Sequence, residues 1–178
     1  MSGFRPIFWG MLFLFGGRIG GWDLLPDAIG YGLIYIGFSR LSRQGGPFAS
    51  GRPLPLILLV MSLPTLHLSW LPGSWLGVVY PIGLAALQLS MVYSLIKGIQ
   101  QLAMAQNRLD LYDMARNCWR LYAIGCCLSI AISGLLRISL LLVLAGLFML
   151  LVRVLMLVLL SRCGRTFMER EGSPPVGV

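Results

Sequence analysis

The stretch Arg18–Gly37, RIGGWDLLPDAIGYGLIYIG, lies between two apolar segments and contains two aspartates, a proline and several glycines. Asp23 is suited to be the N-cap of a helix, because its side chain can accept hydrogen bonds from the first free N–H groups. Pro26 then falls in the first turn, where its missing N–H costs little. The stretch therefore predicts a turn between two helices, and its glycines predict that the two helices pack closely.

The composition indicates a membrane protein. Hydrophobic residues make up 57% of the 178 residues and charged residues only 11%, and the mean hydropathy is +0.83. Soluble domains contain about 25% charged residues, so we expect an all-α, polytopic transmembrane bundle. The net charge of +8 would suggest nucleic acid in a soluble protein. Here the basic residues stand at the ends of apolar segments, so we expect the lipid bilayer as the partner and no nucleic acid.

About six apolar segments approach the length of a membrane span, which is about 17–25 residues. We expect one transmembrane domain over residues 1–168, followed by a polar, proline-rich tail, 169–178, that is disordered. The expected spans are Phe4–Gly21, Leu24–Phe38, Leu54–Leu71, Trp75–Ile96, Trp119–Leu136 and Ile138–Leu160.

The basic residues predict the orientation. With six spans and a cytoplasmic N-terminus, most Lys and Arg residues fall on the inner side, as the positive-inside rule requires. Both termini are then cytoplasmic, and only Arg18 and Arg137 fall on the outer side. Residues 4–38 either span twice or form a re-entrant hairpin, and the charge bias does not distinguish these alternatives. The inner residues are Arg5, Arg40, Arg43, Arg52, Lys97, Arg108, Arg116, Arg120, Arg162, Arg165 and Arg170.

Residues 98–116 are too polar to be a span. Their apolar positions recur every three or four residues, which predicts an amphipathic helix at the inner interface or a cytoplasmic extension of the fourth span. Such a segment serves as a solvated connector, docks a partner or senses lipid.

Asp23 and Asp27 have two interpretations. As the N-cap and a first-turn residue they stabilise the second helix through its dipole. Four residues apart on one helical face, they could instead bind a cation at the outer surface, or Arg18 could neutralise one of them. Two carboxylates alone are a weak metal site, and no metal or cofactor motif accompanies them.

The glycines of this region favour close helix packing. Two pairs have GxxxG spacing, and two further glycines lie seven residues apart on the second segment, where they can face the first. The pairs are Gly16 with Gly20 and Gly17 with Gly21, and the two further glycines are Gly30 and Gly37.

The segments FWGMLFLF and GGWDLLPDAIGYGLIYIGFSRLS, within the first 43 residues, carry a resemblance to a known group. The chain here resembles small, uncharacterised multi-pass membrane proteins of Gram-positive bacteria, in which a D-x-L-P-D-x-x-G-Y element joins the first two apolar segments. This resemblance implies a bacterial plasma membrane and carries no activity or site residues.

Two polar residues fall inside the expected spans. Arg153 either snorkels or makes a structural hydrogen bond, or it binds an anion or substrate. His67 is the single histidine, and it is either a hydrogen-bonded packing residue or a proton relay or ligand.

No catalytic constellation is visible, so we expect a non-enzymatic structural or accessory protein that acts through association, as a homo-oligomer or with another membrane protein. The alternative is a small-solute or ion transporter that uses Asp23, Asp27 and Arg153.

Overall fold

The computed structural model describes residues 3–14, 24–42, 45–62, 76–135 and 139–169, and within these ranges the regular elements are helices. This confirms the all-α prediction for the described part of the chain. The helices are α1 (Phe4–Phe13), α2 (Leu24–Leu41), α3 (Pro47–Gly51), α4 (Pro53–Ser62), α5 (Leu76–Ala105), α6 (Leu109–Leu135) and α7 (Ser139–Glu169).

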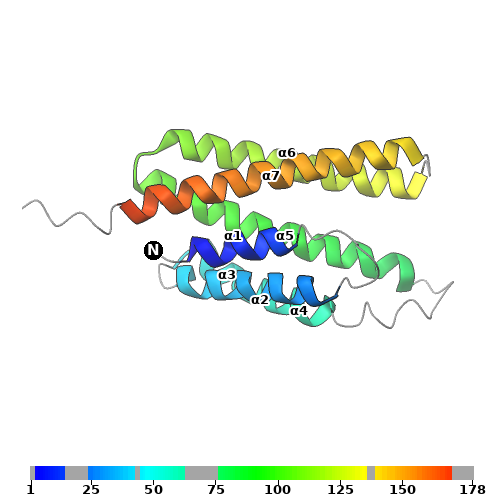
Figure 1. The fold of residues 1–178 in the computed structure, drawn as a ribbon, viewed down its shortest axis with the longest axis horizontal. Helices are drawn as coiled ribbons and strands as arrows, with labels where there is room; N and C mark the ends of the chain where they lie inside the picture. Colours follow the sequence, from blue (N-terminus) through cyan, green and yellow to red (C-terminus); the bar gives the residue numbers. More distant parts are fainter. Residues whose placement is uncertain (1–2, 15–23, 43–44, 63–75, 136–138, 170–178) are drawn as a thin grey trace, which may run out of the picture.

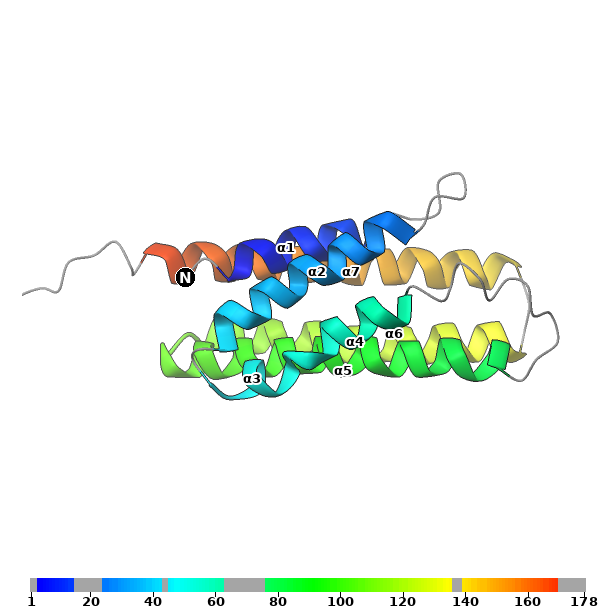
Figure 2. The ribbon, with the colours of Figure 1, turned by 90° about the horizontal axis from the view of Figure 1, so that it is seen from below.

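The long helices α5, α6 and α7 form the body of the bundle, and α1–α4 pack against one side of it (Figure 1). Seen from below, α1 and α7 lie in one layer and α5 and α6 in the other, with α2 crossing obliquely toward α3 and α4 (Figure 2). Because α1 packs on both α2 and α7, the N-terminal hairpin is joined to the C-terminal helix. The start of α1 and the end of α7 therefore lie at the same end of the bundle.

The α1–α2 hairpin is held by glycines on both helices. A Cβ atom on Gly10 would lie 2.6 Å from the carbonyl oxygen of Gly30, and one on Gly37 would overlap Cγ1 of Ile7 and lie 2.8 Å from the carbonyl oxygen of Gly3. The helices are antiparallel, since Gly3 meets Gly37 and Gly10 meets Gly30. Each glycine thus opens space for the backbone or a side chain of the other helix, as in small-residue interfaces of membrane proteins.

The segment 98–116 is not one amphipathic helix, so this form of the prediction is wrong. Asn107 has φ 55° and ends α5. The N–H of Arg108 bonds the carbonyl of Ala103 at 2.9 Å, and the N–H of Asn107 bonds that of Met104 at 3.0 Å. This pair of bonds is a Schellman motif, in which asparagine is one of the few residues that tolerate the left-handed position. Residues 98–105 extend the fourth expected span, as the alternative prediction had it.

The turn between α5 and α6 carries an exposed ion pair. Arg108 donates two hydrogen bonds of 3.2 Å to the carboxylate of Asp110, and these bonds lower the pKa of that carboxyl group. Both side chains are exposed, so the pair contributes little to stability.

The connector between the second and third expected spans contains the short helix α3. Two glycines with positive φ, Gly45 and Gly46, precede it. Its Phe48 is buried and packs edge-on against Phe4, with a ring-centroid distance of 6.5 Å, and it also lies against Gly98 of α5. The connector therefore closes this end of the hydrophobic core instead of crossing the surface.

The predicted segment ends differ from the observed ones. α5 continues beyond Ile96 to Ala105, α6 begins at Leu109 instead of Trp119, and α7 continues beyond Leu160 to Glu169. At 1.5 Å per residue the 30 residues of α5 and the 31 of α7 are each about 45 Å long, which exceeds a hydrocarbon core of about 30 Å. Of the expected tail, Glu169 belongs to α7, and 170–178 lie outside the described residues.

Two helical stretches are long and apolar enough to cross a membrane, Ile82–Ala105 in α5 and Val143–Thr166 in α7. Among the described residues no other stretch meets this criterion, so membrane localisation receives limited support and six spans stay a prediction.

Candidate functional site

Most of the residues singled out around the first turn lie outside the described ranges. This holds for Arg18 and Asp23 and for Gly16, Gly17, Gly20 and Gly21, and His67 of the third expected span lies outside them as well. Asp27 is in α2, one helical turn before Tyr31, but its side chain is not described. Gly30 and Gly37 lie against α1. Of the predicted polar residues, Arg153 is therefore the one whose side chain and surroundings the structure describes.

Arg153 lies near the middle of α7 and reaches across to the end of α1. Its Nη1 donates a hydrogen bond of 3.1 Å to the carbonyl oxygen of Leu14, the C-cap residue of α1. The last carbonyls of a helix have no partner within the helix and carry the negative end of its dipole. The guanidinium thus meets a group that attracts a cation. Of the alternatives for this residue, the structural hydrogen bond is present.

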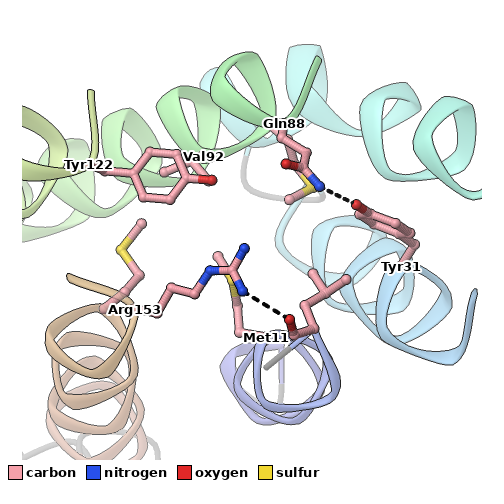
Figure 3. A pocket seen from close by; sticks show the side chains of 9 residues that line it. Met11, Tyr31, Gln88, Val92, Tyr122 and Arg153 are labelled. Atoms are coloured by element: carbon pink, nitrogen blue, oxygen red, sulfur yellow. Dashed lines mark hydrogen bonds between the residues drawn. The ribbon is translucent and has the colours of Figure 1, made fainter. Parts of the chain in front are cut away.

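The same guanidinium borders a cavity of about 110 Å³ inside the bundle. One water needs roughly 10–15 Å³ of such space, so several waters or a small solute fit. Figure 3 shows Arg153 pointing into the space between Tyr122 and the pair formed by Tyr31 and Gln88. We call this space the Arg153 cavity. Its lining comes from α1, α2, α5, α6 and α7 and consists of Met11, Leu14, Tyr31, Gln88, Met91, Val92, Tyr122, Arg153 and Met156.

The polar side chains of the Arg153 cavity are fixed by burial and, for Tyr31 and Gln88, by a mutual hydrogen bond. Nε2 of Gln88 donates a hydrogen bond of 2.6 Å to the hydroxyl of Tyr31. The Tyr31 side chain is only 2% exposed and that of Tyr122 only 7%. A buried polar group of this kind is costly unless it is hydrogen-bonded, so the ordered Tyr31–Gln88 pair marks a built polar site.

The charge of the Arg153 cavity is positive. Among the described residues that line it, Arg153 is cationic and none is acidic. Two tyrosine hydroxyls and one carboxamide supply further hydrogen-bond donors, and methionines supply an adaptable apolar wall. Arginine with hydroxyl and amide donors is the set that recognises a carboxylate or another small anion.

Sequence analysis found Arg153 but missed the other polar groups of the cavity. Gln88 carried a usable signal, because it is the single amide side chain in the apolar run between Leu76 and Ile96. Tyr31 and Tyr122 carried none, because a tyrosine in an apolar helix is most often a packing residue.

The cysteines and the acidic residues do not combine into a metal site in the described part of the chain. No group of three or more His, Cys, Asp or Glu residues is close enough there to hold an ion. All four cysteines are free thiols, with Cys118 and Cys163 buried. Comparison with known proteins finds no matching family model, no similar curated protein and no similar solved structure.

Proposed function

We propose that this chain is a multi-pass protein of the bacterial plasma membrane that binds a small anion in the Arg153 cavity and transports it. The membrane part of the proposal is supported by the surface of the long helices. Only 33% of the apolar stretch of α5 and 28% of that of α7 are buried in the bundle. The core helix of a soluble protein would be mostly buried. The exposed residues of α7 include Leu140, Val143, Leu144, Leu147, Leu150, Leu151, Val154 and Val158.

The basic residues support both termini in the cytoplasm. Apart from Arg153, the described Lys and Arg residues lie in the helix halves nearest one end of the bundle, where α1 begins and α7 ends, or in the turns between those halves (Figure 1). We call it the basic end. The positive-inside rule assigns such an end to the cytoplasm. Its residues are Arg5, Arg40, Arg52, Lys97, Arg108, Arg116, Arg120, Arg162 and Arg165.

Topology can be tested with an engineered cysteine. Ala49 is exposed on α3 at the basic end, so in intact cells Ala49→Cys should stay unlabelled by a membrane-impermeant maleimide and become labelled after lysis. Ser74→Cys, in the expected outer turn, should be labelled in intact cells. The wild-type chain, with its own four free cysteines, is the background. Labelling of Ala49→Cys in intact cells would contradict the orientation.

The Arg153 cavity carries the transport part of the proposal. A charge at the bilayer centre costs about 2.5–3.5 kcal/mol on insertion scales, so an intramembrane Arg is a functional candidate by default. Here it borders a polar cavity and contacts the end of a helix that stops inside the bundle. Substrate sites of transporters commonly lie near the bilayer midplane between helices, where the proposal places this cavity.

Anion transport can be measured with purified protein in liposomes. We expect uptake of labelled chloride, nitrate or acetate above that of protein-free vesicles, and at least an approximately tenfold loss in Arg153→Gln, because a charge-assisted contact is worth roughly 1.5–3 kcal/mol. Arg162→Gln removes an arginine of the same helix that does not line the cavity and should retain uptake.

Two further variants sharpen this assay. Gln88→Leu should weaken uptake by removing the group that orients Tyr31. Asp27→Asn tests whether the acidic residue one turn away takes part in the cycle. If none of these anions enters, or if Arg153→Gln transports as well as the wild-type chain, the proposed function is wrong.

Action through association is the second candidate. Two of the glycines predicted to mediate association, Gly30 and Gly37, already contact α1 of the same chain. This internal use removes the need for a partner at these positions. Association therefore ranks below anion transport.

A further inference from the structure

A second hollow lies on the outside of the bundle, between α1 and the last part of α7. It consists of two adjoining hollows of about 230 and 420 Å³, which share Phe8, Ser161 and Arg165. We call it the α1–α7 groove. α1 and the second half of α7 lie side by side in both views (Figures 1 and 2), so the groove opens on the surface that the proposed membrane would surround.

One end of the α1–α7 groove is basic. Arg5 of α1 and Arg165 of α7 line the first hollow, and Arg162 and Arg165 line the second. All three side chains are exposed. None of them forms an ion pair with another residue in the described part of the chain. Ser161 lines both hollows, and its hydroxyl adds a hydrogen-bond donor.

The other end of the groove is apolar. Its wall is formed by Val154, Leu157 and Val158 of α7 and by Phe8 of α1. From Val154 to Arg165 the helix rises about 16 Å at 1.5 Å per residue, which is about half of a 30 Å hydrocarbon core. The groove therefore runs from the middle of the membrane to one interface and becomes basic at the interface.

We propose that the α1–α7 groove binds one anionic phospholipid, with the phosphate between Arg5, Arg162 and Arg165 and an acyl chain along the apolar wall. Basic pockets between transmembrane helices on the cytoplasmic side are the usual sites for such headgroups. The groove as a whole, from Val154 to Arg165, is about as long as one leaflet of the hydrocarbon core, a length that a soluble phosphate would not require. The proposal rests on the membrane part of the proposed function and is independent of the Arg153 cavity.

Trp9 provides a direct probe of this site. It lines the first hollow and is 50% exposed, so brominated acyl chains in the groove should quench its fluorescence. We would titrate brominated phosphatidylglycerol into the purified chain in mixed micelles of detergent and phosphatidylcholine. Quenching is expected to saturate at a much lower mole fraction of brominated phosphatidylglycerol than of brominated phosphatidylcholine, and this saturable component should be lost in Trp9→Phe, which identifies the responding tryptophan.

Paired arginine variants distinguish lipid binding in the α1–α7 groove from general attraction of the lipid by the positive surface charge. Each basic residue near an anionic lipid strengthens binding about fivefold, so Arg5→Gln with Arg165→Gln should weaken the apparent affinity about 30-fold. Arg116→Gln with Arg120→Gln makes the same change in net charge on exposed residues of α6 that do not line the groove, and it should retain the affinity.

Three results would overturn the lipid site. They are equal quenching by the two lipids, an equal loss of affinity in the α6 pair, and displacement of the lipid by glycerol phosphate, which carries the headgroup charge without acyl chains. Arg153→Gln should bind phosphatidylglycerol as the wild-type chain does. A failure of anion transport is thereby distinguished from a failure of this site.

Discussion

Gly37→Ala is expected to lower the free energy of unfolding by about 1–3 kcal/mol, the usual cost of overpacking. A Cβ atom at this position would overlap Cγ1 of Ile7 and lie 2.8 Å from the carbonyl oxygen of Gly3. The backbone oxygen cannot rotate away, so α1 and α2 must move apart. The loss should outweigh the advantage in helix propensity, which favours alanine over glycine by about 0.8–1.0 kcal/mol. Unfolding by SDS in mixed micelles, followed by circular dichroism, measures the change.

Gly83→Ala is the matched control. Gly83 is an exposed residue of α5, and a Cβ atom there would meet nothing within 4 Å. This variant should be neutral or slightly more stable. Gly10→Ala should behave like Gly37→Ala, because its Cβ atom would lie 2.6 Å from the carbonyl oxygen of Gly30. Equal stability of the Gly37 and Gly83 variants would contradict the proposed role of close α1–α2 contact.

Arg153→Met is expected to abolish anion uptake while changing the free energy of unfolding by no more than about 2 kcal/mol. In the proposed membrane, removing this charge from the bilayer centre should gain about 2.5–3.5 kcal/mol. Losing the charged hydrogen bond to the carbonyl of Leu14 should cost roughly 1.5–3 kcal/mol. The two effects nearly cancel, and methionine resembles the side chains that already line the cavity. Liposome uptake and SDS unfolding of the same preparation measure both quantities.

Arg153→Lys tests the geometry of the charge. Lysine keeps the positive charge but lacks the planar fork of donors, so it cannot contact both the Leu14 carbonyl and an anion in the same way. Uptake should fall between those of the wild-type chain and Arg153→Met. A large loss of stability in Arg153→Met, with uptake per folded protein unchanged, would instead make Arg153 a cap for the end of α1 and nothing more.

The sequence by itself determined the helical class and the gathering of charge at one end. An apolar run with few charges can satisfy its backbone in lipid only as a helix, and this holds whatever the neighbouring segments do. The orientation of Gly30 and Gly37 toward α1 was also predictable, because a spacing of seven residues keeps two positions on one helix face. The prominence of Arg153 followed from the cost of a charge in an apolar segment.

The tertiary structure alone decided what these residues meet. Gly3 and Gly10 repeat the seven-residue spacing on α1, but their pairing with Gly37 and Gly30 depends on the antiparallel register. The left-handed turn at Asn107 divided an amphipathic segment whose periodicity ran through it. The Arg153 cavity draws on α1, α2, α5, α6 and α7, with lining residues spread from Met11 to Met156. Periodicity reports which face of a helix is apolar, whereas the partner of that face depends on how all the helices pack together.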